Sequence, residues 1–127
     1  MKFGGRTFRA EEVSVAEIAE LNTLVCVLAE RRDGRGARLE IQRSIVFDVQ
    51  DKARGMETYC VSTEDGASHY GGIVSWSVDE ELLTIVLDAP AAEELGFSGF
   101  SVGLSTSNES RQLLRSGLQK ITSVTSA

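Results

Sequence analysis

The sequence is poor in the residue types that metal and nucleophilic sites need. It has one histidine and two cysteines among 127 residues. A zinc site needs three or four nitrogen and sulfur ligands, which this set does not supply without carboxylates. Both cysteines stand inside short apolar segments, where free Cys behaves as a small buried hydrophobe. These scarcities argue against a metal site and against a disulfide framework.

Long apolar runs are also missing. No segment approaches the roughly 18 apolar residues of a membrane helix, and residues 1–6 lack the apolar core of a signal peptide. We therefore expect a cytoplasmic protein with no membrane partner. With 127 residues, 42% apolar and 25% charged, the chain has the length and balance of one globular domain, residues 1–127.

Basic residues are absent from a long central stretch. Residues 1–55 carry ten basic and nine acidic side chains, whereas residues 56–110 carry ten acidic and no basic ones. The formal charge is −6. Nucleic-acid binding depends on Lys and Arg that neutralise phosphates, so we expect no nucleic-acid partner. The acidic stretch is either an ordinary solvated face or a surface for a basic partner.

The hydrophobic pattern predicts mostly strands. Residues 21–28 are apolar and 38–47 alternate in part, and the Asp-Gly turn signal between them predicts a hairpin. Residues 73–78 and 82–87 flank an acidic turn and predict a second hairpin. Further strands are expected at 3–13, 56–63 and 100–104.

Two helices are expected in the last third of the chain. Asp88 is a candidate N-cap, Pro90 is typical of the first turn of a helix, and Gly96 is typical of its end. Together they predict a short helix over residues 91–95. A capping box at Thr106 and Glu109 predicts a final helix to about residue 122. Residues 48–55 predict a loop or a single helical turn. The expected fold is α+β, a mainly antiparallel sheet of about seven strands with a short helix and a C-terminal helix packed on it.

No residue pattern predicts catalysis. His69 lacks a recognisable nucleophile arrangement, so a loop histidine that bonds a backbone carbonyl is the simpler interpretation. Glu80-Glu81 and Glu93-Glu94 are sequence neighbours whose side chains diverge, unlike the facing carboxylates of glycosidases. An enzyme of that type would need two acids converging in a pocket. We expect no catalytic residue, no cofactor and no metal.

Several short motifs follow one another through the middle of the chain. They are Ile41-Gln42-Arg43-Ser44, Asp48-Val49-Gln50-Asp51, Gly55-Met56-Glu57-Thr58-Tyr59-Cys60, Asp65-Gly66-Ala67-Ser68-His69-Tyr70-Gly71-Gly72-Ile73 with Trp76, Leu83-Thr84-Ile85, Ala91-Ala92-Glu93-Glu94-Leu95-Gly96 and Leu114-x-x-Gly117-Leu118. Their order and spacing resemble the immunity protein 10 family. The resemblance covers roughly residues 39–121.

The resemblance implies a binding protein rather than an enzyme. Immunity proteins of bacterial polymorphic toxin systems bind and neutralise a cognate toxin domain, and they are small, cytoplasmic and often acidic. Nucleases, which carry basic surfaces to hold phosphates, are common among such toxins. The resemblance therefore implies a cognate toxin domain as partner, a basic nuclease being one class, bound through a partly acidic surface.

Two segments are candidates for the toxin-facing surface. Residues 48–55 and 64–72 are expected at the same end of the sheet. The alternative is that these residues only define the bends of the chain. The candidate contacts are Gln50, Asp51, Glu64, Asp65, His69 and Tyr70.

A second function stays open, that of a non-catalytic homodimeric accessory or small-ligand-binding domain. An exposed apolar strand face or sheet edge can pair with another copy of the chain. A toxin gene directly upstream supports immunity, and its absence favours the second function.

Overall fold

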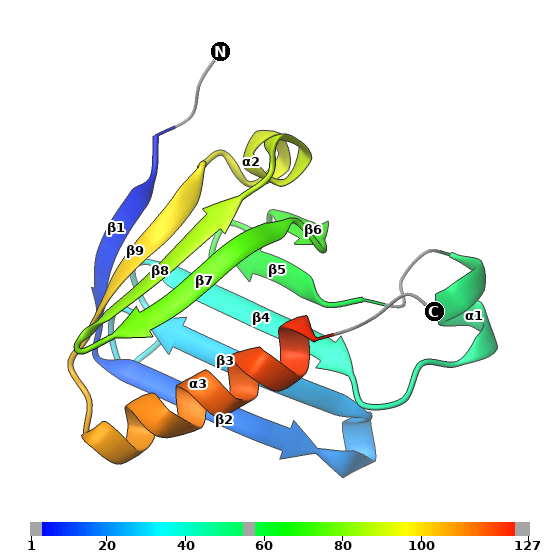
Figure 1. The fold of residues 1–127 in the computed structure, drawn as a ribbon, viewed down its shortest axis with the longest axis horizontal. Coiled ribbons are helices and arrows are strands. Elements are labelled where there is room, and N and C mark those ends of the chain that lie inside the picture. Colours follow the sequence, from blue (N-terminus) through cyan, green and yellow to red (C-terminus); the bar gives the residue numbers. More distant parts are fainter. Residues whose placement is uncertain (1–3, 55–57, 124–127) are drawn as a thin grey trace.

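The computed structural model describes residues 4–54 and 58–123, which form two β-sheets and three α-helices (Figure 1). Sheet A has four strands, and neighbouring strands are antiparallel except for the parallel pair β1 and β9. The predicted hairpin of β7 and β8 is confirmed. In order across the sheet, the strands are β1 (Arg6–Ala10), β9 (Gly99–Leu104), β8 (Leu82–Leu87) and β7 (Ile73–Asp79).

Sheet B has five strands, each antiparallel to its neighbours, in the order of the sequence. The predicted hairpin around the Asp-Gly turn is confirmed as β3 and β4. A short 3-10 helix, Ala19–Leu21, connects β2 to β3. The strands are β2 (Glu12–Ile18), β3 (Thr23–Ala29), β4 (Arg38–Ser44), β5 (Cys60–Thr63) and β6 (Ser68–Tyr70).

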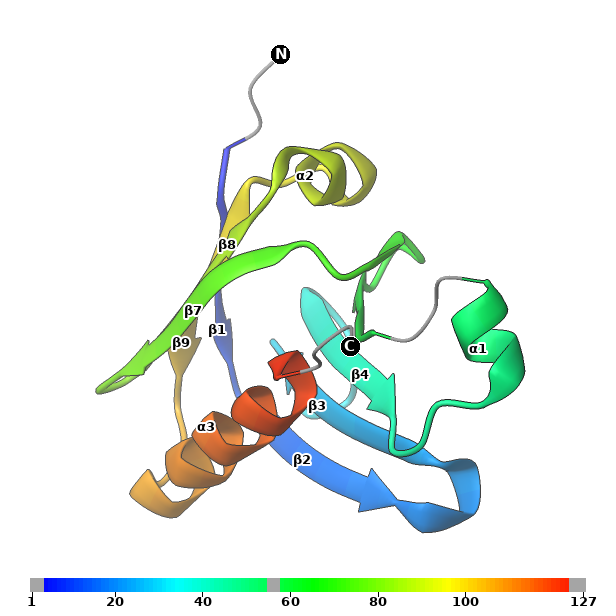
Figure 2. The same cartoon turned by 45° about the vertical axis from the view of Figure 1, so that its right-hand side comes forward.

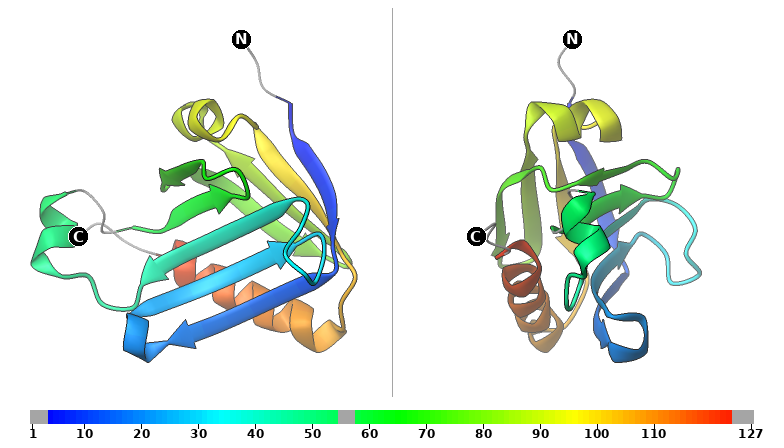
Figure 3. Two further views of the ribbon diagram at one scale, coloured as in Figure 1. Left: turned by 180° about the vertical axis from the view of Figure 1, so that it is seen from behind. Right: turned by 90° about the vertical axis from the view of Figure 1, so that its right-hand side faces the viewer.

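The helices occupy three different places. Helix α1 (Val49–Ala53) follows β4 and projects from one end of the molecule (Figures 1 and 3). Helix α2 (Ala89–Leu95) begins at Asp88, whose side chain accepts a hydrogen bond from the Ala91 backbone N–H, as the cap signal predicted. Helix α3 (Asn108–Thr122) is the C-terminal helix. Among the described residues, no helix is long and apolar enough to cross a membrane.

One hydrophobic core joins both sheets and α3. Figure 2 shows sheet A nearly edge-on, with sheet B diverging from it and α3 lying across sheet B. Helix α3 contacts β2, β3 and β4 of sheet B and β7 of sheet A. Each fully buried Leu or Ile contributes about 1.5–3 kcal/mol by leaving water. The largest fully buried side chains are Phe100, Leu28, Leu39, Ile41, Leu83, Ile85, Leu104, Leu114, Leu118 and Ile121.

The predicted α+β class is confirmed, but the single sheet of about seven strands is wrong. The strand expected at 3–13 divides at Glu11, whose backbone N–H bonds Ala29 and so belongs to sheet B. Before this point Phe8 and Ala10 face the core from sheet A, and after it the chain continues as β2. The chain therefore changes sheets where one strand was expected.

One local prediction needs correction, and two others are confirmed as far as the structure describes them. The N-cap of α3 is Ser107, whose hydroxyl accepts from the Ser110 backbone N–H, and not Thr106. Residues 48–55 contain the predicted single turn as α1, although Gly55 lies outside the described residues. The expected strand over 56–63 is described from residue 58 onward and forms β5.

Candidate functional site

The six candidate contacts do not lie at one end of sheet B. Strand β5 runs antiparallel to β4, with Gln42 opposite Cys60 and Leu39 opposite Thr63. The turn after Thr63 therefore lies beside the beginning of β4, whereas α1 follows its end. The predicted shared end is wrong for Glu64 and Asp65. The prediction is correct for Tyr70, because β6 runs antiparallel to β5 and places Tyr70 opposite Cys60, near the end of β4.

Glu64 connects the two sheets. Its carboxylate accepts two hydrogen bonds from the Arg6 guanidinium, at 2.7 and 2.8 Å, and one from the Arg38 backbone N–H at 2.9 Å. The Arg6 guanidinium also lies over the Phe97 ring, 5.1 Å from its centroid. The hydrogen bond from Arg6 lowers the pKa of Glu64 and raises the pKa of Arg6. Glu64 is therefore engaged within the fold.

Asp65 shapes the turn between β5 and β6. Its carboxylate accepts from the Thr63 hydroxyl and from the Ala67 backbone N–H, an arrangement by which Asp side chains organise turns. The hydrogen bond from Thr63 is the main cause that lowers the pKa of Asp65. The Asp65 side chain has a local structural role.

His69 joins β6 to α2 instead of bonding a backbone carbonyl from a loop. It pairs with Val61 on the core side of sheet B, and its Nδ1 lies 2.5 Å from Glu94 Oε1. Gly72 packs closely in the same region, and its carbonyl accepts from the Asp88 backbone N–H. Within the described part of the chain, no three His, Cys, Asp or Glu side chains are placed to hold a metal ion.

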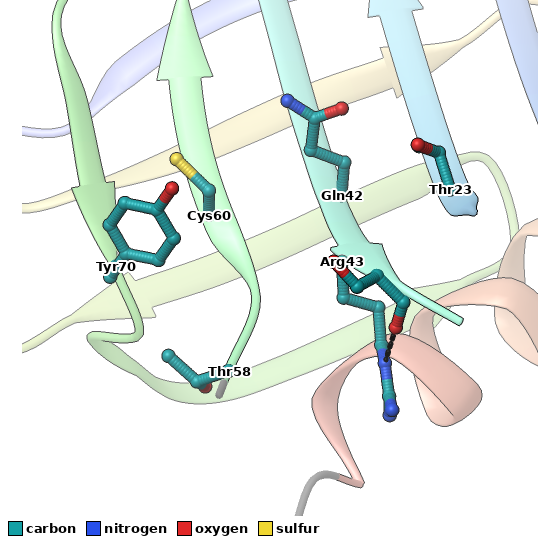
Figure 4. Close-up of a pocket in the computed structure, with 7 residues that line it drawn as sticks. Thr23, Gln42, Arg43, Thr58, Cys60 and Tyr70 are labelled. Carbon is teal, nitrogen blue, oxygen red and sulfur yellow. Dashed lines mark hydrogen bonds between the residues drawn. The ribbon is translucent and has the colours of Figure 1, made fainter. Parts of the chain in front are cut away.

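Tyr70 lies on the outer face of sheet B, in a row that crosses all five strands. The row is Ala16, Val25, Gln42, Cys60 and Tyr70, one residue from each strand. A hollow of about 160 Å³ opens beside it. In Figure 4, Gln42, Cys60 and Thr23 stand on the same side of the sheet and the Tyr70 ring leans toward Cys60. The lining residues are Thr23, Gln42, Arg43, Ser44, Thr58, Cys60 and Tyr70.

The thiol in this hollow is not activated. Burial is the main cause that raises the pKa of Cys60, and the nearby charges of Glu40 and Glu94 raise it further. A reactive cysteine needs the opposite environment, one that favours the thiolate. Cys26 is fully buried, and burial raises its pKa to about 12. Neither cysteine therefore has the environment of a reactive thiol: Cys26 packs on the core face of sheet B, and Cys60 lies on its outer face.

Apolar side chains are exposed at the end of sheet B from which α1 projects. Val46 and Val49 are 68% and 82% exposed, and Leu21 is 68% exposed. Asn22 holds the two segments together, because its side chain bonds both the N–H and the C=O of Val46. The remaining candidates are here too, since Gln50 is exposed on α1. Asp51 belongs to α1, but its side chain lies outside the described part of the chain.

The sequence predicted Tyr70 and the α1 segment as parts of the binding surface, but it did not predict the hollow or the exposed apolar residues near it. Gln42 and Thr23 lie in strands whose outward faces look ordinary in the sequence. The register of five strands brings them beside Cys60 and Tyr70. Val46 and Val49, apolar residues in an otherwise polar segment, are a further local signal of this surface in the sequence.

The comparison with known families supports the resemblance noted in the sequence. A family model described as Immunity protein 10 matches residues 9–112, which is most of the chain. Neither a curated protein nor a solved structure matches it. Proteins of such families are generally non-catalytic. The chain therefore belongs to the immunity protein 10 family, and this membership implies a role in toxin immunity.

Proposed function

We propose that this chain is a cytoplasmic immunity protein that neutralises a cognate bacterial toxin domain by binding it, without a catalytic step. The observation that carries the proposal is the family match over residues 9–112. The site supports it, because its side chains are arranged for contact rather than for catalysis. His69 is paired with Glu94, and the environment of Cys60 disfavours its thiolate.

We place the toxin-facing surface on sheet B at the end that bears α1. Tyr70 is 46% exposed, a large aromatic of the type enriched at the centres of protein interfaces. Gln50 and Asp51 belong to this surface through α1. Glu64, Asp65 and His69, whose side chains are engaged within the fold, would act on binding only indirectly.

The acidic residues support long-range attraction rather than one acidic patch. Among the described residues of the stretch 56–110, the acidic side chains are divided between the β5–β6 turn, the end of β7 with the β7–β8 turn, and α2 with its N-cap Asp88, and Glu109 lies at the start of α3. A net charge of −6 raises the rate of encounter with a basic partner even when the charges are dispersed. A basic nuclease is the class of toxin that fits this charge best.

Co-expression tests the proposal. The toxin domain encoded directly upstream should stop growth of a host cell, and this chain should restore growth and co-purify with the toxin. Tyr70→Ala should weaken both effects. Val86→Ala is the matched control, since Val86 is 44% exposed on the outer face of sheet A. Failure of the wild-type chain to bind or protect would contradict the proposal.

The outer face of sheet A favours a second candidate, a homodimeric accessory protein. Leu82 and Val86 are both 44% exposed there. One row of residues across this face begins at Arg9 on β1 and ends at Asp79 on β7. If two copies packed face to face about a twofold axis parallel to the strands, Arg9 of each copy would lie opposite Asp79 of the other. Light scattering after size-exclusion chromatography tests this: a dimer that Leu82→Ser dissociates supports the candidate, and a monomer at all concentrations contradicts it.

A further inference from the structure

The hollow beside Cys60 is built by separate parts of the chain. Thr23 comes from β3, Gln42 and Ser44 from β4, Cys60 from β5 and Tyr70 from β6. Its volume of about 160 Å³ is the size of one amino-acid side chain, not of a cofactor. The hollow therefore fits a single side chain of a protein partner.

The polar groups of the hollow are available to an occupant. Within residues 4–54 and 58–123, no hydrogen bond engages the side chains of Gln42, Ser44, Thr58 or Tyr70. The Gln42 amide oxygen and the hydroxyl oxygens are acceptors. Among the lining residues that the structure describes, none carries a carboxylate. An occupant that donates several hydrogen bonds would satisfy this set.

The electrostatic environment favours a cation. Glu40 stands two residues before Gln42 on the same outer face of sheet B, where its carboxylate accepts a hydrogen bond from the Arg38 guanidinium at 2.8 Å, and its charge still raises the pKa of the Cys60 thiol. Arg43, the one cation among the described lining residues, points away from the hollow. Its guanidinium lies 4.7 Å from the Phe47 ring centroid and donates to the carbonyls of Ser44 and Lys120. Figure 4 shows this side chain directed toward α3. The half-exposed Tyr70 ring offers a face for cation–π contact.

We propose that this hollow binds one arginine or lysine side chain of the cognate toxin domain. The guanidinium or ammonium would stack on the Tyr70 ring and donate to the Gln42 amide oxygen and the neighbouring hydroxyls. Exposed Leu21, Val46 and Val49 at the same end of the sheet would exclude water around the contact. The inference rests on the proposed function, because its occupant belongs to the toxin.

Cys60 provides a direct footprint of the occupant. Cys26 is 0% exposed, so N-ethylmaleimide should alkylate Cys60 much faster in the folded protein. The toxin domain, added in increasing amounts, should lower the alkylation rate in proportion to the fraction of immunity protein left unbound. Prior alkylation should in turn weaken toxin binding.

A thiol on the other sheet is the matched control. The double variant Cys60→Ser with Ser77→Cys places a reactive thiol on the outer face of sheet A, where Ser77 is exposed. Its alkylation rate should not change with toxin. Protection of this thiol, or an unchanged Cys60 rate while the toxin is demonstrably bound, would overturn the hollow as the contact and leave the proposed function standing. Absence of any complex would overturn both.

Substitutions at Tyr70 test the charge of the occupant. Tyr70→Phe keeps the ring and should retain most of the affinity, whereas Tyr70→Leu removes it and should weaken binding by about tenfold. Melting curves should show that both variants fold, since Tyr70 lies on an edge strand and is half-exposed. Equal affinities for the Phe and Leu variants would show that the occupant is not a cation on the ring.

Discussion

At the scale of single residues, Glu64 and Arg6 join the two sheets by a polar contact. Arg6 begins β1 in sheet A, and Glu64 lies in the β5–β6 turn of sheet B. Their side chains are 19% and 32% exposed, and the contact is bidentate. Because the geometry is fixed and partly shielded from water, the pair should contribute more than an ordinary surface ion pair.

We predict that Glu64→Gln lowers the free energy of unfolding by about 1 kcal/mol at pH 7. The folded-state pKa of Glu64 is lowered, so its stabilisation is present above the unfolded-state pKa. It is lost as pH falls from about 4.3 through the lower folded-state value. Denaturant titrations of wild type and variant should therefore converge in acid. Glu93→Gln, on the exposed face of α2, should change little at any pH; a constant difference for Glu64→Gln would contradict this account.

At Gly72 an added methyl group should be costly for two reasons, the backbone conformation and the close approach of α2. Its φ is +96°, and a Cβ there would lie 2.5 Å from Ala91 Cβ in α2. We predict that Gly72→Ala lowers the free energy of unfolding by about 2–3 kcal/mol. Gly66→Ala separates the cost of the positive φ from the cost of the contact with α2, because Gly66 has φ +88° but no atom within 4 Å of an added Cβ. Its cost should be about 1 kcal/mol, and equal costs at both sites would show that the approach of α2 is unimportant.

At the scale of elements, α3 depends on one small residue for its distance from sheet B. A Cβ on Gly117 would lie 2.7 Å from Val15 Cγ1 and 3.0 Å from Cys26 Sγ. We predict that Gly117→Val lowers the free energy of unfolding by about 2 kcal/mol or more, because the helix must move outward. Ser116→Val, on the exposed side of α3, should cost about 0.5 kcal/mol or less. Similar effects of the two changes in thermal denaturation would contradict the packing described.

The elements that the sequence predicted are those with local signals. The β7–β8 hairpin has alternating residues around a two-residue loop, and α2 has its cap at Asp88. The division into two sheets was not predictable in this way. It depends on the parallel pairing of β1 with β9, whose residues are far apart in the sequence. The same limit applies to the site: Tyr70 stands out by type, but only strand register places Gln42 and Thr23 near it.

At the scale of the whole molecule, the net charge of −6 should act on the rate of toxin binding more than on the bound state. We predict that the association rate constant falls as salt concentration rises, while the dissociation rate constant changes less. Stopped-flow measurements that follow Trp76, the single tryptophan, can record both if toxin binding changes its fluorescence. An association rate that does not depend on salt would contradict electrostatic attraction of a basic toxin.

If this protein neutralises its toxin by binding alone, a stoichiometric titration of toxin activity will show it. Purified immunity protein is added in steps to a fixed amount of toxin domain, well above the dissociation constant, and residual activity is measured after each step. We predict a linear decrease that reaches zero at an equimolar ratio and does not change with incubation time. Complete loss of activity with a small fraction of an equivalent, progressing with time, would show catalytic inactivation and contradict the account.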